Sequence, residues 1–588
     1  MHSPVTNLSS GRKAAAFKTI WIVDFEFRSD PGDLPWPVCM VAKEIKSNKV
    51  IRLWRDELLA IRRSPFEVGP DDLFVSFFAS AEIGCLLELG WELPINILDL
   101  YVEHRAATNG VRPNGNGLIG ALICRGLGHI DPGHKETMRD LVMTRSEWSL
   151  SEQQEILDYC ASDVIAVEAL LRSMEPDLDW DRALLRGRYM TAVARMERVG
   201  IPIDVPRYQQ LSRYWQAIRG RLIAEVDRDY GVYEGHTFKQ QRFSNWLEKQ
   251  GIEWPRLPSG RLRLDDDTFK AQAKRWKVIG PLRILRQSLS DLRLNELQVG
   301  RDGRNRTLLS PFRAITGRNQ PSNSKFVFGP SRWIRGLIKP SEGYALAYID
   351  FSSQEIAIAA ALSGDRLLMD AYSGGDPYMA FAIQAKLVPP DATAESHKAV
   401  RDRCKEVVLG VNYGMGASTM AERAGISTTE ALELLRAHRA TYSVFWEWND
   451  KAVHSGMLNN EMLTVFGWKR RMKANDKPMS LMNFPMQANG AEMMRIAAIA
   501  ATEAGIEVCA PVHDAFLIMA PEAEIDEKVA QMQQLMSKAG EAVTGGFPVR
   551  TTANVIRYPG RFVDERGDEM WRLICNLADE IDPASPSV

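Results

Sequence analysis

The sequence predicts a multidomain α/β (α+β) protein, and three observations lead to that prediction. At 588 residues the chain is too long for a single hydrophobic core. Apolar, strand-like runs alternate with helix-like segments over residues 19–100, and this alternation returns from residue 307 to about residue 565. Between these regions, residues 186–300 form a long, charged, helix-like tract. Three interruptions are expected in this tract, at Pro202, Pro206 and residues 255–260.

The first region is expected to begin with a strand and to end with a helix. Residues 19–27 form an apolar, strand-like run. Residues 150–172 have helical periodicity, with Ser149 or Ser151 as the N-cap. The residues that follow, 175–180, break this pattern and mark the expected domain junction.

Composition excludes several classes of protein. Hydrophobic residues make up 45% and charged residues 25% of the chain, which are ordinary values for a globular protein. No apolar run approaches the ~18 residues that a membrane span requires, and the N-terminal residues lack the apolar stretch of a signal peptide. The seven cysteines are scattered without a C-x-x-C pair, which argues against disulfides and zinc. We expect a reduced, cytoplasmic protein with no membrane partner.

Charge is unevenly distributed along the chain. The net charge is −2, yet residues 274–339 contain 15 lysines and arginines against three acids. A basic tract within an otherwise acidic protein is typical of a surface that binds nucleic-acid phosphates. A solvated basic face gives the same pattern, so other motifs must decide between the two.

Two aspartates in the last region lie at the ends of apolar, strand-like runs. Asp350 ends the run that begins at Tyr344. His513 and Asp514 separate two apolar runs within residues 507–519, which predicts a hairpin with a polar tip. Aspartates at strand ends can converge and hold two Mg²⁺ ions roughly 3.5–4 Å apart, as nucleotidyl transfer requires. Each aspartate taken alone is more often a turn or cap residue.

The segment between these aspartates favours the catalytic interpretation. Arg401, Lys405, Leu409 and Tyr413 lie at i, i+4 spacing and are followed by Gly414. On a helix they form one stripe, ~18 Å long at ~1.5 Å rise per residue. The cationic half of the stripe suits a triphosphate, and the apolar half suits a sugar and a base. An isolated R-x-x-x-K pair is usually a solvated helix face, but here the order is aspartate, helix, aspartate.

These segments resemble motifs of the family A DNA polymerases, the family of bacterial DNA polymerase I and many phage replicases. Residues 350–355 resemble motif A, residues 401–414 resemble motif B, and residues 512–514 resemble motif C. Two supporting segments also match, at residues 316–318 and 483–487. The resemblance implies a right-hand fold of palm, thumb and fingers that binds primer–template DNA and deoxynucleoside triphosphates.

The resemblance also implies a role for each motif residue. Asp350 and Asp514 would bind two Mg²⁺ ions, with Mn²⁺ as an alternative. The residues implied to bind the incoming nucleotide are Arg401, Lys405, Leu409, Tyr413 and Glu355, the last as a steric gate against ribonucleotides. The residues implied to contact DNA near the primer terminus are Arg318, Asn483, Gln487 and His513.

The chain departs from the family pattern at two positions. The family usually has a glutamate after the motif C aspartate, where this chain has Ala515. That glutamate is an auxiliary carboxylate, so we expect an active polymerase with weaker metal affinity. The family usually has an aromatic residue where this chain has Leu409. Leucine packs against a sugar but cannot stack, so we predict poor incorporation of dideoxynucleotides.

A second group of carboxylates lies near the N-terminus. Strand periodicity puts Asp24 and Glu26 on one face of the first run, where burial without a cation is costly. Tyr159 and Asp163 are one helical turn apart. These residues resemble the first and third motifs of DEDD-type 3′→5′ exonucleases, which have an RNase H-like fold. The resemblance implies two metal ions bound by Asp24, Glu26 and Asp163, with Tyr159 orienting the attacking water.

The second exonuclease motif leaves two candidates. The family supplies an aspartate there, whereas this chain offers Glu82, eight residues before Gly90, which would close the helix. Asp99 is the competing carboxylate, in a segment where a structural role is expected. We favour Glu82 as the remaining metal ligand.

Together these motifs predict a DNA polymerase with a proofreading exonuclease, working as a monomer whose accessory proteins are unknown. Its compact layout, which leaves no room for a 5′-nuclease, is similar to that of phage or prophage replicases, so the host cytoplasm is the expected location. The expected domains are an N-terminal tail (1–18), exonuclease (19–180), polymerase (181–578, with thumb about 200–310, palm about 310–370 and 460–578, fingers about 370–460) and a C-terminal tail (579–588).

Three alternative functions compete with this prediction. A single-subunit RNA polymerase shares the palm chemistry, but Glu355 and the exonuclease argue against it. A catalytically silent DNA-binding protein is suggested only by Ala515, against which the intact Asp350 and Asp514 weigh. A nuclease acting alone in repair would leave Arg401 and Lys405 unexplained.

Overall fold

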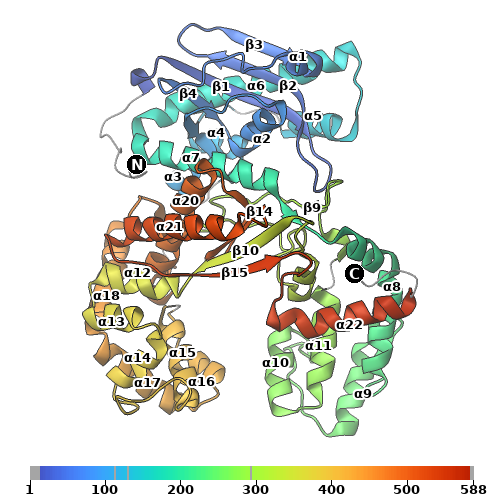
Figure 1. The fold of residues 1–588 in the computed structure, drawn as a ribbon, viewed down its shortest axis with the longest axis vertical. Coiled ribbons are helices and arrows are strands. Elements are labelled where there is room, and N and C mark those ends of the chain that lie inside the picture. Colours follow the sequence, from blue (N-terminus) through green and yellow to red (C-terminus); the bar gives the residue numbers. More distant parts are fainter. Residues whose placement is uncertain are drawn as a thin grey trace.

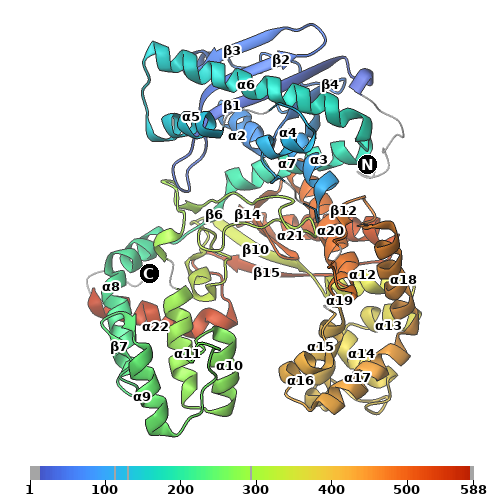
Figure 2. The same cartoon turned by 180° about the vertical axis from the view of Figure 1, so that it is seen from behind.

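The computed structural model describes residues 14–111, 114–128, 132–291, 294–412, 414–473 and 475–582. Three parts follow one another along the chain: an N-terminal sheet with its helices, a helical part, and a second sheet with a helical arm (Figures 1 and 2). The predicted α/β multidomain class is confirmed.

The N-terminal part is a five-stranded sheet in the order β3-β2-β1-β4-β5. Strand β1 pairs antiparallel with β2 and parallel with β4. Alternate side chains of β1 lie on opposite faces of the sheet and are therefore buried in two different hydrophobic cores. Ile20 and Ile22 belong to a core that includes residues of α4 and α6, and Trp21 and Val23 belong to a core that includes residues of α2 and α7. The elements of this part are η1 (Ala14–Ala16), β1 (Thr19–Arg28), β2 (Trp36–Glu44), β3 (Val50–Trp54), α1 (Arg55–Ala60), β4 (Asp72–Ser76), α2 (Ser80–Leu89), β5 (Asn96–Asp99), α3 (Leu100–Thr108), α4 (Leu118–Cys124), α5 (Pro132–Thr144) and α6 (Leu150–Met174).

Two sequence predictions about these helices are confirmed. Helix α6 begins after Ser149, whose hydroxyl accepts from the Glu152 backbone N–H in a capping box. Helix α2 ends at Gly90, which has the left-handed conformation (φ +69°) that favours glycine.

The middle part is helical and includes an arm built by α8 to α11 (Figure 1). Pro206 was expected to interrupt a helix, but it lies in the first turn of α8, where proline costs no hydrogen bond. The elements of this part are η2 (Glu175–Asp177), α7 (Trp180–Val199), β6 (Ile201–Pro202), α8 (Val205–Asp227), β7 (Tyr233–Glu234), β8 (Thr237–Phe238), α9 (Gln240–Gln250), α10 (Asp266–Arg275), α11 (Ile279–Asp291), η3 (Leu294–Glu296), β9 (Arg304–Asn305) and η4 (Arg332–Leu337).

The last part is built on a four-stranded antiparallel sheet in the order β13-β14-β10-β15, called here the central sheet. Helices α20 and α21 cover one face of it (Figure 1). The helices α13 to α17 form a second arm, on the side opposite α8–α11 (Figure 2).

The elements of the last part are β10 (Tyr344–Phe351), α12 (Gln354–Ser363), α13 (Arg366–Ser373), α14 (Pro377–Gln384), α15 (Lys398–Asn412), α16 (Ala417–Ala424), α17 (Thr428–Thr441), α18 (Ser443–Asn459), β11 (Glu461–Leu463), β12 (Lys469–Arg471), α19 (Pro478–Leu481), α20 (Phe484–Glu503), β13 (Glu507–Val512), β14 (Ala515–Pro521), α21 (Ile525–Thr544), β15 (Thr551–Arg557) and α22 (Glu565–Ile581). The alternation expected from residue 307 is therefore wrong between α12 and α18, where the described residues form helices without an intervening strand.

The described residues of both expected tails are part of the fold. Ala14 and Phe17 are buried against the N-terminal sheet. Helix α22 continues to Ile581, because Asp579 pairs with Arg207 at 2.6 Å and Glu580 pairs with Arg221 at 2.9 Å. The outer residues of both tails, 1–13 and 583–588, lie outside the described residues. Among the helices that the structure describes, none has the length and apolar character needed to cross a membrane.

Candidate active sites

The central sheet brings Asp350 and Asp514 together. Asp350 is the penultimate residue of β10, and Asp514 lies in the turn between β13 and β14, so the predicted hairpin is confirmed. The Phe351 backbone N–H donates to the Asp514 carbonyl oxygen at 3.1 Å, which fixes the two segments side by side. Burial raises the pKa of Asp514, and the charge of Asp350 acts in the same direction. A cation bound between these carboxylates would relieve both effects.

One neighbour of Asp350 was not predicted from the sequence. Thr552, in β15, donates its hydroxyl to Asp350 Oδ1. On the other side of β10, Ala515 lies opposite Asp350 and is fully buried. The position after Asp514 therefore contributes a methyl group and no ligand atom to this site.

The predicted stripe lies on helix α15. Arg401, Lys405 and Leu409 fall on one face of this helix, and Tyr413 lies outside the described residues. The Arg401 guanidinium pairs with Asp376 at 2.5 Å. Leu409 is half-buried, so part of its side chain is available for contact.

Asp376 and Tyr378 were missed by the sequence analysis. Asp376 caps helix α14 by accepting from the backbone N–H groups of Tyr378 and Met379. The Tyr378 ring lies 5.6 Å from the Arg401 guanidinium and 5.9 Å from the Lys405 ammonium. Burial raises the pKa of Tyr378, and a hydrogen bond from Ser353 opposes that rise. Tyr378 thus connects the cations of α15 with a residue three positions beyond Asp350.

Glu355 and Arg318 contact each other. Glu355 lies in the first turn of α12, and its carboxylate is 3.5 Å from the Arg318 guanidinium. The neighbouring Gln354 donates to the Gly490 carbonyl oxygen at 3.3 Å, which joins α12 to α20. Since Glu355 is mostly buried, with 15% of its side chain exposed, its place beside the sheet is well defined.

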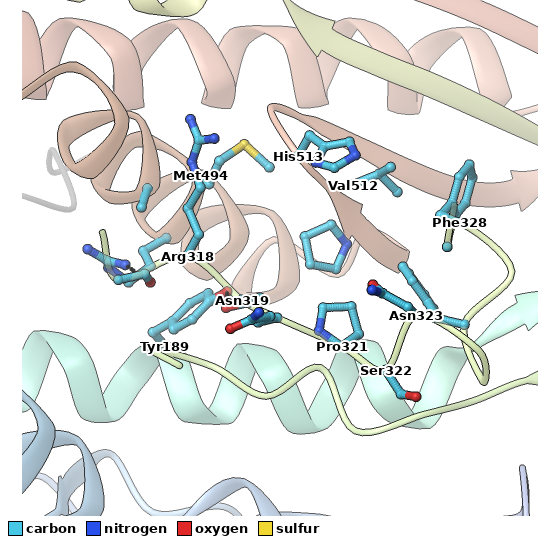
Figure 3. A pocket seen from close by; sticks show the side chains of 17 residues that line it. Tyr189, Arg318, Asn319, Pro321, Ser322, Asn323, Phe328, Met494, Val512 and His513 are labelled. Atoms are coloured by element: carbon cyan, nitrogen blue, oxygen red, sulfur yellow. Dashed lines mark hydrogen bonds between the residues drawn. The ribbon is translucent and has the colours of Figure 1, made fainter. Parts of the chain in front are cut away.

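A cavity of about 190 Å³ lies between Arg318 and the hairpin tip (Figure 3). His513, at the tip, has φ +57°, and burial lowers the pKa of its imidazole. Tyr189 of α7 donates to Asn319 Oδ1 at 3.0 Å on the opposite wall. The cavity therefore joins two expected DNA-contacting residues with α7, whose contribution had not been predicted.

The other two expected DNA-contacting residues mark the start of α20. Asn483 immediately precedes this helix, and the Gln487 backbone N–H donates to its carbonyl oxygen at 3.0 Å. Asn483 Oδ1 is buried and has no hydrogen-bond partner among the described residues. It is therefore an acceptor that a bound group could satisfy.

The basic tract of residues 274–339 is less uniformly cationic than its composition indicates. Several of its arginines pair with acids, and two of these acids lie far away in the sequence. Arg301 pairs with Asp33 at 2.7 Å, and Arg335 pairs with Asp564 at 2.6 Å. The further ion-paired arginines are Arg283, Arg306 and Arg318. Part of the tract therefore joins segments of the protein and does not form one free surface.

The N-terminal sheet gathers a second group of carboxylates. Asp24 and Glu26 of β1 lie with Asp163 of α6, and oxygen atoms of the three are within 4.8 Å of one another. The Tyr159 hydroxyl donates to Asp163 Oδ2 at 3.1 Å. The Cys160 thiol donates to Asp24 Oδ2 at 3.3 Å. Strand β1 and helix α6 therefore place the predicted residues close together.

The electrostatics of this cluster suit a bound cation. Burial raises the pKa of Asp24 to about 7, and the charge of Asp163 adds to the effect. Burial also raises the pKa of Glu26 and of Glu82 well above the usual range, with the charge of Asp24 as the next cause. Asp163 Oδ1 and Glu82 Oε2 are buried without a hydrogen-bond partner among the described residues. Oxygen atoms left unpaired in this way fit a hard divalent cation.

Glu82 and Asp99 have different surroundings. Asp99 accepts hydrogen bonds from four backbone N–H groups, and it caps helix α3. Burial raises its pKa to about 6, and these hydrogen bonds oppose the rise. The structural role expected for Asp99 is confirmed. Glu82 is buried beside Asp24 but lies outside the group of three within 4.8 Å.

Lys135 of α5 was not predicted from the sequence. Its ammonium pairs with Asp163 Oδ2 at 2.6 Å and lies 5.5 Å from the Tyr159 ring. One turn further along α5, Arg139 lines a cavity of about 610 Å³ together with Phe27 and Leu308. The walls of this cavity come from both the N-terminal part and the part that follows.

Comparison with known proteins finds similarity to DNA polymerases. The model described as DNA polymerase family A matches residues 294–555. DNA polymerase I of Aquifex aeolicus is 25% identical over 447 residues, which are 69% of this chain and 76% of that enzyme. The thermostable DNA polymerase I of Thermus thermophilus is 27% identical over 59% of this chain and 44% of its own length. The DNA polymerase of Mycobacterium phage L5 is 25% identical over 67% of this chain and 66% of its own length.

A solved structure has the same fold. The POL domain of Pol1 from M. smegmatis, in a complex with DNA primer-template and dNTP, gives a TM-score of 0.72 over 92% of this chain and 95% of that one, at 19% identity. The chain spans less than half of the Thermus thermophilus enzyme, so its similarity to that enzyme is limited to the matched part. Residues 294–555 of this chain therefore match the family A DNA polymerases, and the chain is similar to DNA polymerase I.

Proposed function

We propose that this chain is a template-directed DNA polymerase that also removes nucleotides from the primer 3′ end. The observation that carries the proposal is the presence of two separate carboxylate sites, one on each sheet. The central sheet holds Asp350 and Asp514 within the segment that matches the family. The N-terminal sheet holds Asp24, Glu26 and Asp163 outside that segment.

In the polymerase site, α15 would bind the incoming deoxynucleoside triphosphate. Arg401 and Lys405 offer two cations on one helix face, and Arg401 would exchange Asp376 for a phosphate. Glu355, held by Arg318, would crowd the sugar 2′ position. Arg318, Asn483, Gln487 and His513 would contact the duplex near the primer terminus.

Asp350 and Asp514 would hold the metal ions of this site, for which we propose two Mg²⁺, with Mn²⁺ as a substitute. When bound, such ions lower the pKa of the primer 3′-hydroxyl and stabilise the leaving pyrophosphate. The protein's own contribution is to fix the two aspartates through the backbone hydrogen bond from Phe351 to Asp514 and to align the triphosphate along α15.

In the exonuclease site, Asp24, Glu26, Asp163 and Glu82 would hold two Mg²⁺ ions. The unpaired oxygens of Asp163 and Glu82 and the raised pKa values of the buried acids support this assignment. Tyr159, fixed by its hydrogen bond to Asp163, would orient the attacking water. A mispaired primer end would be cleaved here, as proofreading requires.

The likeness to Mycobacterium phage polymerases supports a role in replicating a phage or prophage genome in the host cytoplasm. We propose that the chain works as a monomer on primer–template DNA.

A labelled primer–template assay tests the two sites separately. Wild type, Asp514→Ala and Asp24→Ala are incubated with Mg²⁺, with and without deoxynucleotides. We expect Asp514→Ala to abolish extension while shortening persists, and Asp24→Ala to abolish shortening while extension persists. If wild type shortens primers but never extends them, Ala515 marks an inactive polymerase and the chain is a nuclease alone. A nuclease acting alone is the second candidate function, because Ala515 supplies no carboxylate to the polymerase site.

A further inference from the structure

The register of the central sheet gives Asp350 two unlike neighbours. Strand β10 lies between β14 and β15, and Asp350 is opposite Ala515 on one side and Thr552 on the other. Residues directly opposite each other in antiparallel strands have their side chains on the same face. The Asp350 carboxylate therefore lies between a methyl group that cannot bind a metal and a hydroxyl that can donate a hydrogen bond.

Thr552 uses that hydroxyl on the carboxylate. It donates to Asp350 Oδ1, which leaves Oδ2 without a side-chain partner in the part of the chain that the structure describes. The adjacent Thr551 is opposite Phe351, so its side chain lies on the other face of the sheet. Two consecutive threonines thus have different environments, and only Thr552 is beside the metal-binding carboxylate.

The start of β15 is fixed in place by a buried tyrosine. The Arg550 carbonyl oxygen accepts from the Ser352 backbone N–H at 2.9 Å. The Tyr372 hydroxyl accepts from the Arg550 N–H at 2.8 Å and donates to the Ser352 carbonyl oxygen at 3.1 Å. Since Tyr372 is 1% exposed, this network holds β15 against the end of β10. The Thr552 hydroxyl therefore meets Asp350 from a rigid position.

We infer that Thr552 is a positioning residue for the polymerase metal site, which holds Asp350 in its ligating orientation where the opposite neighbour, Ala515, supplies no carboxylate. The inference rests on the proposed polymerase function. Hydrogen bonds that orient a ligating carboxylate commonly change metal affinity or activity by roughly 10–100-fold when removed. Thr552 would act through Asp350, to which its hydroxyl donates.

The test compares Thr552→Val, which keeps the shape but removes the hydroxyl, with Thr552→Ser, which restores it. Thr551→Val is the matched control on the other face of the sheet. All variants carry Asp24→Ala, so that the N-terminal cluster does not contribute. Two quantities are measured on the full chain with primer–template DNA: Mn²⁺ affinity by electron paramagnetic resonance, and the Mg²⁺ concentration that gives half-maximal extension.

We expect Thr552→Val to weaken Mn²⁺ binding and to raise the Mg²⁺ requirement by roughly tenfold or more, with kcat at saturating Mg²⁺ changed by much less. Thr552→Ser should recover both values, and Thr551→Val should match the parent. If Thr552→Val is poorly folded, Thr552→Ala is measured instead.

Equal Mn²⁺ affinity in Thr552→Val and Thr551→Val would overturn the inference. A loss of kcat at saturating metal without a change in affinity would overturn it as well. If the Asp24→Ala parent extends no primer at all, the proposed polymerase function fails, while the Mn²⁺ measurements still decide the role of Thr552.

Discussion

The two carboxylate sites differ in how closely their acids are packed. In the N-terminal site, oxygen atoms of Asp24, Glu26 and Asp163 lie within 4.8 Å of one another, and burial holds the pKa of Asp24 at about 7. In the central sheet, the corresponding group is the pair Asp350 and Asp514, steadied by one backbone hydrogen bond. The first site groups three carboxylates closely, with Glu82 buried nearby, whereas the second holds two.

This difference indicates how each site would respond to the loss of a metal ion. Crowded, buried carboxylates cannot all stay ionised without a cation, so the N-terminal site takes up protons or an ammonium group. Lys135 supplies such a group by pairing with Asp163. The pair in the central sheet brings fewer negative charges together and has less need of a substitute cation, and its geometry depends on neighbours such as Thr552.

The largest expected effect distinguishes the two buried acids beside the N-terminal site. We expect Glu82→Gln to reduce primer shortening by roughly 10–100-fold, because it would remove a metal ligand. Asp99→Asn should instead lower the melting temperature and retain shortening, because Asp99 accepts four backbone N–H groups. Shortening rates and thermal unfolding of both variants check this. The assignment of Glu82 is wrong if Asp99→Asn abolishes shortening without loss of stability.

The second prediction concerns sugar selection in the central site. Because a leucine at position 409 could pack against a sugar but could not stack on it, we expect dideoxynucleotides to be used at least roughly tenfold less efficiently than deoxynucleotides, about 1.4 kcal/mol of discrimination. A primer-extension competition between the two substrates measures the ratio. Comparable use of both substrates would contradict the prediction.

The third prediction uses pH to test the crowding of the N-terminal acids. In the metal-free protein, the pKa of Asp24 is raised from 3.8 to about 7, so the folded state binds a proton more tightly than the unfolded state. The contribution to the free energy of unfolding is therefore fully present below about pH 4 and is lost as pH rises through about 7. Each unit of pKa difference corresponds to about 1.4 kcal/mol.

Thermal unfolding in EDTA between pH 4.5 and 8 measures this effect. The melting temperature of wild type should fall more steeply with pH than that of Asp24→Asn, and Mg²⁺ added at pH 8 should reverse the fall. Parallel curves for the two proteins would show that Asp24 is not crowded as described.

The smallest expected effect concerns Lys135. The Lys135 ammonium pairs with the Asp163 carboxylate in the metal-free protein and would compete with a metal ion for it. Lys135→Ala should therefore strengthen divalent-metal binding at the N-terminal site by a few-fold, less than about 1.4 kcal/mol. Calorimetric titration with Mn²⁺ in an Asp514→Ala background measures this affinity. Arg139→Ala, one turn along the same helix, is the matched control and should leave it unchanged. Weaker binding in Lys135→Ala would show that the lysine supports the metal site.

The sequence by itself determined several local elements and supplied most of the residues that we propose for both sites. Strand periodicity placed Asp24 beside Glu26, and helical periodicity placed Arg401 beside Lys405, because both patterns are local properties of the backbone. The Ser149 cap and the Gly90 helix end are local for the same reason. Two predictions from local sequence were wrong. Pro206 lies in the first turn of α8 and does not interrupt a helix. Residues 579–581 belong to helix α22, where Asp579 and Glu580 form ion pairs with α8.

Only the tertiary structure decided which distant groups meet these residues. Thr552 reaches Asp350 through strand register, Asp376 reaches Arg401 between two helices, and Lys135 reaches Asp163 from α5. No sequence spacing encodes such contacts, because each depends on how separate elements pack. The basic tract shows the same limit: its composition indicates a cationic surface, but Arg301 and Arg335 are neutralised by acids from other parts of the chain. Charge can be counted from the sequence, whereas its partners are fixed by the fold.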